Sequence, residues 1–196
     1  MEMKGNNSEE IKGAEAVVIH NGNMVLGMQK PKRWYDLGNG ERATVIKTLG
    51  GQIEEVDKNS SRKALIREVL EEVKGIEEKD IRVTTNPIFT KKIRMGDLNT
   101  FERDSNLSME ADFYLLEILS KEHIEPNDLP ALLEIPVKEF LKLEFTKKES
   151  LNKLKKYVIK SIKFQDSLPE HYVLMIPEEV KEFLKKIKEY EEKIER

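Results

Sequence analysis

A short amphipathic segment that follows two adjacent glycines places the strongest constraint on how this chain of 196 residues can fold. Residues 60–73 carry apolar side chains at the spacing of one helical face and therefore predict a helix. The apolar positions are Ala64, Leu65, Ile66, Val69, Leu70 and Val73. A helix with one apolar stripe buries that stripe against another layer. We expect that layer to be a sheet.

Short apolar runs around this helix predict the strands. The first two runs flank His20-Asn21-Gly22-Asn23, a sequence typical of a hairpin turn, in which we expect His20 to contact solvent. The expected strands are residues 14–19, 24–29, 44–49, 81–95 and 109–119. The expected later helices are residues 137–143, residues 147–160 and a last helix that opens at Pro177. Strands come first and most helices later, with one helix inserted after the glycine pair, which predicts an α+β or a mixed α/β sandwich.

The chain divides into three parts by composition and pattern. We expect a disordered leader over residues 1–13, one domain over residues 14–143, and a helical C-terminal extension over residues 144–196 packed on the same domain. The last helix has an apolar stripe made of Val180, Phe183, Leu184, Ile187, Tyr190 and Ile194. This stripe either packs on its own domain or forms the contact of a homodimer. A DNA-binding winged helix is disfavoured because the segment lacks a basic recognition helix.

Composition excludes several classes of function. The net charge is −3, so a generic nucleic-acid-binding surface is not expected. No cysteine is present, which excludes disulfides, Cys-ligated zinc and a thiol nucleophile. The three histidines are too scattered to form a metal motif. No signal peptide or membrane span is visible, so we expect a cytoplasmic protein with no membrane partner.

Three glutamates on the predicted helix are the strongest candidates for chemistry. Glu68, Glu71 and Glu72 share an arc of roughly 100° on a helical wheel. Like charges at this spacing repel one another, and a hard divalent cation such as Mg²⁺ would remove the repulsion. The preceding Gly50-Gly51 lets the backbone approach a ligand closely. The alternative is a solvated acidic helix face, which a glutamate-rich chain also produces by chance.

At these residues the sequence resembles the Nudix hydrolase family. The segment Arg67-Glu68-Val69-Leu70-Glu71-Glu72 matches the core of the family motif fully. Upstream, Gly51 is followed after five residues by Asp57 where the family has Glu, and nine residues instead of seven then precede Arg67. Two residues instead of one precede Gly75-Ile76. The resemblance covers roughly residues 14–143 and implies an α/β/α sandwich with a mixed sheet.

The resemblance also implies roles for the motif residues. Glu68, Glu71 and Glu72, with the backbone carbonyl of Gly50, would hold Mg²⁺ or Mn²⁺. Gly51, Asp57 and Arg67 would have structural roles, with Asp57 and Arg67 orienting helix and loop. The implied reaction is attack of a metal-activated water on phosphorus, which cleaves the diphosphate linkage of a nucleoside diphosphate derivative.

Residues that recognise the substrate are less well defined. Trp34 and Tyr35 are candidates for stacking on a base, or are a packing anchor. Arg94 and Arg103 are candidates for binding phosphate, or are solvated loop arginines. In many family members another acid from a distal loop takes part, and its candidates here are Glu110, Glu122, Glu125, Asp128 and Glu134.

Two other functions remain open at this point. One is a catalytically silent Nudix-like sensor or scaffold that binds a nucleotide without turnover, although all three motif glutamates are present. The other is an RNA-decapping activity, which would need a basic groove that the balanced charge does not suggest.

Overall fold

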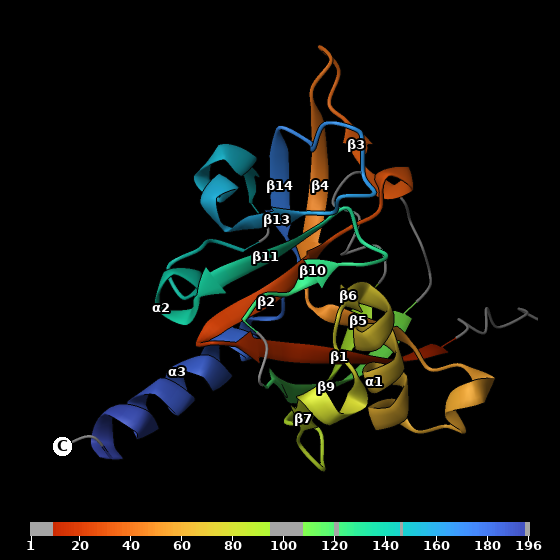
Figure 1. Cartoon of the computed structure of the whole chain (residues 1–196), viewed down its shortest axis with the longest axis vertical. Helices are drawn as coiled ribbons and strands as arrows, with labels where there is room; N and C mark the ends of the chain where they lie inside the picture. The colour runs from red at the N-terminus through yellow and green to blue at the C-terminus, as the bar shows by residue number, and fades with distance from the viewer. Residues whose placement is uncertain (1–9, 95–107, 120–121, 146, 195–196) are drawn as a thin grey trace, which may run out of the picture.

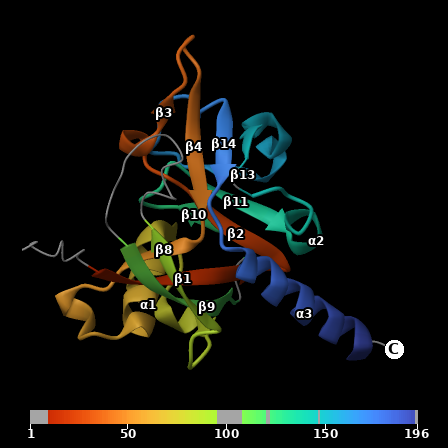
Figure 2. The ribbon, with the colours of Figure 1, turned by 180° about the vertical axis from the view of Figure 1, so that it is seen from behind.

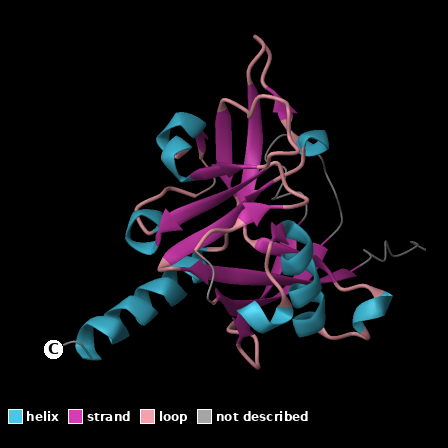
Figure 3. Cartoon of the chain, viewed as in Figure 1, coloured by secondary structure: helices cyan, strands magenta, loops and turns pink. Residues whose placement is uncertain are grey.

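The computed structural model describes residues 10–94, 108–119, 122–145 and 147–194. A large mixed sheet forms its centre, with helices on both sides (Figures 1 and 3). The long strands are β1 Glu10–His20, β2 Asn23–Met28, β4 Arg42–Lys47, β5 Leu49–Gln52, β8 Phe89–Arg94, β9 Ser108–Ile118, β11 Ala131–Pro136 and β14 His171–Leu174. The short strands are β3 Tyr35–Asp36, β6 Val73–Lys74, β7 Ile81–Val83, β10 Glu125–Pro126, β12 Lys148–Ser150 and β13 Val158–Lys160. The α-helices are α1 Ser61–Glu72, α2 Val137–Phe140 and α3 Glu178–Ile194.

The main path through the sheet runs β12-β14-β4-β2-β1-β9-β7. Strands β1 and β9 are parallel, as are β14 and β4, whereas the other pairs are antiparallel. Strand β1 pairs with β5 along its first half and with β2 along its second half. This arrangement brings the Gly50-Gly51 segment of β5 against Ala14 and Glu15 of β1, which places the glycine pair inside the sheet.

Two hydrophobic cores occupy the two faces of the sheet, and β1 contributes to both because successive side chains alternate. Ala14, Ala16 and Val18 face the core that α1 covers. Val17 faces the other core, which includes residues of α2 and α3. The predicted α/β/α sandwich with a mixed sheet and a C-terminal helix is therefore confirmed.

The hairpin between β1 and β2 is also confirmed, with Asn21 and Gly22 both at positive φ. The first residue of the turn segment, however, does not contact solvent as predicted. His20 is 1% exposed, and its Nδ1 lies 2.5 Å from Oε1 of Glu134 on β11, because β11 pairs with β2 and brings that carboxylate over the turn.

The segment after residue 143 differs from expectation. The helix predicted over residues 147–160 is wrong, since β12, two 3₁₀ turns (Leu151–Lys153 and Lys155–Tyr157) and β13 form there instead. Strand β13 pairs with β11, and β14 pairs with β4. The segment thus extends the same sheet before α3 begins.

Helix α3 begins directly after Pro177, as predicted, and leads away from the sheet in both views (Figures 1 and 2). Val180 and Leu184 are buried in the adjacent core, so its first turns pack on the chain itself. The predicted leader lies outside the described residues up to residue 9, and its last four residues belong to β1. No helix among the described residues has the length and apolar character needed to span a membrane.

Candidate functional site

Helix α1 holds the three motif glutamates above β1 and β5. It begins after Ser60, whose side chain accepts a hydrogen bond from the Lys63 amide, and it packs Leu65 and Val69 into the core beneath. The glutamates do not all point away from the sheet. Glu72 is buried at 8% exposure and Glu68 is partly buried, whereas the side chain of Glu71 is 55% exposed. The acidic arc therefore runs from solvent into the gap between α1 and β5.

An ion pair fixes the helix to the preceding loop. Arg67 donates from Nε and Nη2 to the two carboxylate oxygens of Asp57, at 3.2 and 3.0 Å. Asp57 is 3% exposed and also accepts the Glu54 amide, while Arg67 reaches the carbonyl of Gln52 on β5. The Arg67 guanidinium holds the pKa of Asp57 below its usual range. The pair forms even though the loop is two residues longer than in the family motif.

We expect Arg67→Met to lower the Tm by several degrees, because it leaves a buried carboxylate with only one hydrogen-bond donor. The matched control is Arg82→Met, which removes the same charge from an ion pair with Glu117 in which Arg82 is 70% exposed. That change should move the Tm by no more than about 2 °C. Equal shifts for the two variants in a thermal melt would contradict the role assigned to Arg67.

The glycine pair provides the surface against which two of the glutamates lie. The Gly50 amide donates to Oε2 of Glu72 at 3.1 Å. A Cβ on Gly51 would lie 2.5–2.7 Å from the carboxylate atoms of Glu68, so that carboxylate rests directly on the Gly51 backbone. Oε1 of Glu68 also accepts from Nη1 of Arg67 at 2.8 Å. Backbone and arginine together fix the position of Glu68.

A buried glutamate and a partly buried lysine, neither of which the motif identified, also belong to this site. Glu15 lies opposite Gly50 in the β1–β5 pairing, is 7% exposed, and accepts the Thr48 hydroxyl at 2.7 Å. Lys47, at the end of β4, donates from Nζ to the Gly50 carbonyl at 2.9 Å and lies 3.9 Å from Oε1 of Glu72. Glu15 is the one charged residue of the strand predicted over residues 14–19, and Lys47 is the one charged residue of the strand predicted over residues 44–49, which was the signal available in the sequence.

The charges of this cluster alter one another. Burial raises the pKa of Glu72 to about 7, and burial likewise raises the pKa of Glu15. Burial alone would lower the pKa of Lys47, but the carboxylates of Glu15, Glu72 and Glu68 outweigh it and raise that pKa. The ammonium therefore stays charged and partly compensates the buried acids.

The donor atoms suit a hard divalent cation. They are all oxygens, from carboxylates and one backbone carbonyl, which is the set that Mg²⁺ and Mn²⁺ prefer. The ammonium of Lys47 already places a positive charge between the Gly50 carbonyl and Glu72. Among the described residues, however, no three acidic or imidazole side chains converge on one point as metal ligands do. In this arrangement Arg67 engages Glu68, and Lys47 lies beside Glu72.

A small cavity of about 250 Å³ adjoins the exposed glutamate of the motif. Glu71, Asn127, Asp128 and Lys163 line it. Asn127 closes the C-terminal end of α1 by donating to the carbonyls of Glu71 and Glu72, and Lys163 donates to its side-chain oxygen at 3.0 Å. Asp128, which pairs with Lys30, is the distal acid that shares this cavity with the motif.

The other distal acids have separate surroundings. Glu134 contacts His20, and Glu125 pairs with Lys74 at 2.9 Å. Glu110 and Glu122 are exposed. The structure thus brings Asp128 to the motif helix through the Asn127 contacts and gives Glu125 and Glu134 partners of their own.

The aromatic candidates for substrate binding have packing partners of their own. Tyr35 lies in β3, where it pairs with Ala43 of β4. The Trp34 ring packs edge-on against Phe164 and lies beneath the Arg42 guanidinium, while its Nε1 donates to the Gln29 carbonyl. These contacts agree with the packing-anchor interpretation. The Arg94 side chain and all of Arg103 lie outside the described residues.

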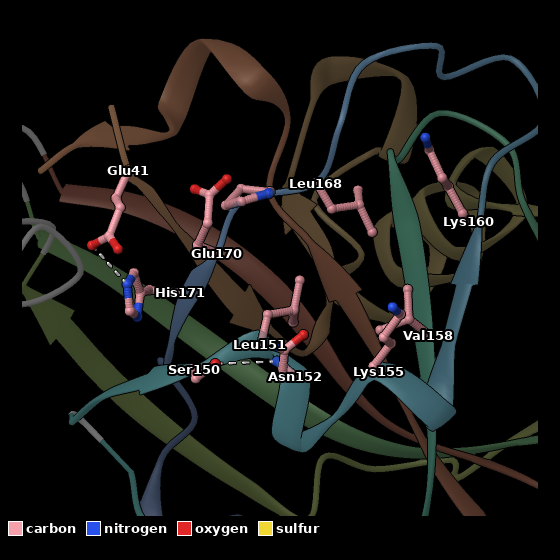
Figure 4. A pocket seen from close by; sticks show the side chains of 11 residues that line it. Glu41, Ser150, Leu151, Asn152, Lys155, Val158, Lys160, Leu168, Glu170 and His171 are labelled. Atoms are coloured by element: carbon pink, nitrogen blue, oxygen red, sulfur yellow. Dashed lines mark hydrogen bonds and ion pairs between the residues drawn. The ribbon is translucent and has the colours of Figure 1, made fainter. Parts of the chain in front are cut away.

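A larger cavity of about 650 Å³ lies between β14, β13 and the 3₁₀ turns of the C-terminal segment (Figure 4). Its polar lining carries both signs of charge, with Lys155 and Lys160 on one side and the ion pair of His171 and Glu41 on the other. None of the residues predicted for the site lines it.

No protein-family model and no curated protein matches this sequence. Among solved structures, the chain is similar to the dihydroneopterin triphosphate pyrophosphohydrolase of E. coli (14% identity, TM-score 0.48, 67% of this chain and 84% of that one). It is also similar to the C. elegans Ap4A hydrolase (12%, 0.45, 68% and 86%) and to the NUDIX domain of Shewanella oneidensis NrtR complexed with ADP ribose (11%, 0.46, 73% and 83%). At such low identity and TM-score, no activity or substrate is carried over to this chain from these proteins.

Proposed function

We propose that this protein is a Nudix-type hydrolase that cleaves the diphosphate linkage of a nucleoside diphosphate derivative with the help of Mg²⁺ or Mn²⁺. One observation carries the proposal. Glu68 and Glu72 of the α1 motif contact the Gly50-Gly51 segment of β5, and Arg67 ties α1 to the preceding loop through Asp57 and to β5 through the Gln52 carbonyl. An acidic helix face of purely solvating function needs neither a buried carboxylate nor a glycine backbone pressed against it.

The chain's own residues would prepare the site in defined ways. Glu68, Glu71, Glu72 and the Gly50 carbonyl would hold the cation, and Gly51 leaves room for the Glu68 carboxylate. Arg67 orients Glu68, while Asp57 and the Gln52 carbonyl orient Arg67. When bound, a divalent cation neutralises the diphosphate and lowers the pKa of the attacking water. Of the distal acids predicted from the sequence, Asp128 is the candidate for a further acid, because it shares a cavity with Glu71.

The test is hydrolysis by the purified full chain with Mg²⁺ on a panel of nucleoside triphosphates, ADP-ribose, dinucleoside polyphosphates and coenzyme A, with products separated by chromatography. We expect at least one compound to be cleaved at a diphosphate bond. We expect Glu71→Gln to reduce the rate more than tenfold, whereas the matched change at exposed Glu78 leaves it unchanged.

A catalytically silent sensor is the second candidate, and the ion pairs that engage Glu68 and Glu72 favour it. A sensor would give a different result in the same experiment. A nucleotide would raise the Tm of the protein without product formation, and that result with every compound would reject the hydrolase. A cytoplasmic location and a homodimer formed through α3 stay predictions.

A further inference from the structure

Lys47 occupies a position that the proposed reaction does not use. Its Nζ donates to the Gly50 carbonyl at 2.9 Å and lies 3.9 Å from Oε1 of Glu72, and its side chain is 24% exposed. Glu15, from the neighbouring strand, lies opposite Gly50 and adds a second buried carboxylate to the surroundings of the ammonium. The lysine is thus a cation enclosed by the atoms that a divalent cation would need.

Electrostatic repulsion opposes simultaneous binding of a divalent cation and this ammonium to the Gly50 carbonyl. Mg²⁺ lies about 2.1 Å from an oxygen ligand. With Nζ 2.9 Å from the same oxygen, the two charges would be no more than about 5 Å apart and would repel each other strongly. The four-carbon stem of a lysine is flexible, and about a quarter of this side chain is exposed to solvent. The ammonium can therefore move from the Gly50 carbonyl into solvent.

We propose that Lys47 is an internal competitor for the divalent cation, which holds the Gly50 carbonyl and Glu72 until the cation displaces it. This inference rests on the proposed function, because it takes Gly50 and Glu72 as ligands. It adds that the metal affinity of this chain is set by a lysine on β4 as well as by the carboxylates of α1. Removing the ammonium should therefore tighten metal binding.

The experiment is isothermal titration calorimetry of the metal-free full chain with Mg²⁺ at pH 8.5, above the pKa of about 7 that burial gives Glu72. We expect Lys47→Met to bind Mg²⁺ at least tenfold more tightly than the wild type. Lys47→Arg keeps the charge and should show no tightening. The matched control is Lys142→Met, which removes a lysine paired with Glu139 on the surface and should leave the affinity unchanged.

Loss of Lys47 alone leaves Glu15 buried without its cation, so a second variant protects the test from misfolding. Glu15→Gln with Lys47→Met removes both charges and retains a hydrogen-bond acceptor for Thr48. It should also bind Mg²⁺ more tightly than the wild type. Unchanged or weaker binding by both Lys47→Met and the double variant overturns the proposal, even if the wild type hydrolyses diphosphates. Absence of Mg²⁺ binding in every variant, together with no hydrolysis, would instead reject the proposed function.

Discussion

Glu72→Gln should make the metal-free protein more stable at pH 8 while reducing diphosphate hydrolysis more than a hundredfold. The stabilisation follows from burial, which raises the pKa of Glu72 to about 7 in the folded state from an ordinary value near 4.5. The neutral amide avoids the cost of a buried charge and still accepts the Gly50 amide. The loss of activity follows from removing a charged ligand from the proposed metal site.

The stability difference between the wild type and Glu72→Gln depends on pH. Between pH 4.5 and 7 the folded state keeps the proton on Glu72 while the unfolded state releases it, so wild-type stability falls as pH rises through this window. The Gln variant lacks that term. The stability difference between the two should be near zero at pH 4.5 and reach about 2–3 kcal/mol above pH 7, on the order of 5 °C in Tm.

Urea unfolding of both proteins in EDTA across this pH range measures the difference directly. Glu71→Gln is the control, because Glu71 is exposed and its removal should change the free energy of unfolding by less than about 0.5 kcal/mol at every pH. A Glu72→Gln variant that is less stable than the wild type at pH 8 would show that Glu72 and Lys47 form a net stabilising pair, contrary to this prediction.

Alanine at the two adjacent glycines should affect different properties, folding at Gly50 and hydrolysis at Gly51. Gly50 has φ +140°, and a Cβ there would overlap the Ala14 carbonyl and lie 2.8 Å from the Cα of Glu15, both of them backbone atoms that cannot move aside. We expect Gly50→Ala to cost on the order of 4 kcal/mol and to leave little folded protein. The three atoms nearest to a Cβ on Gly51 all belong to the Glu68 carboxylate, which is the end of a flexible side chain. Gly51→Ala should therefore fold but lose hydrolysis more than tenfold.

Chemical denaturation and the hydrolysis assay together separate these effects. The control for Gly50 is Gly75→Ala, since Gly75 also has positive φ but has no atom within 4 Å of its Cβ position. That change should cost only about 1 kcal/mol from backbone strain. If Gly51→Ala were fully active, the Glu68 carboxylate would not need its place on the Gly51 backbone, and the proposed site would be wrong in that detail.

Elements that depend on residues close together in the sequence could be predicted from the sequence. The hairpin turn at Asn21-Gly22 and the helix after Ser60 are both present, because turn residues and a capped apolar stripe act within a few residues. Residues 147–160 were mispredicted because Leu151, Leu154 and Tyr157 recur at nearly helical spacing. There, pairing of β12 with β14 and of β13 with β11 outweighs the local preference, and those partners are distant in sequence.

The site likewise has one part that a contiguous motif predicts and another part that only the tertiary fold brings together. The motif on α1 was visible as a run of residues, and Arg67 and Asp57 do pair. Glu15 and Lys47 reach the site from two other strands, and only the sheet register shows that they meet at Gly50. The burial of Glu72 was missed because the helical wheel sets the acidic arc opposite the apolar stripe, whereas β5 covers part of that arc.

The pairing of β14 with β4 makes the C-terminal segment part of the same sheet as the strand that ends in Lys47. His171–Leu174 lie in register with Ala43–Ile46, and the Met175 amide donates to the Ile46 carbonyl. A shortened protein ending near residue 143 would leave this side of β4 as a bare, largely apolar edge, which invites edge-to-edge aggregation. Efforts to produce a minimal version of this protein should therefore keep the chain at least through β14.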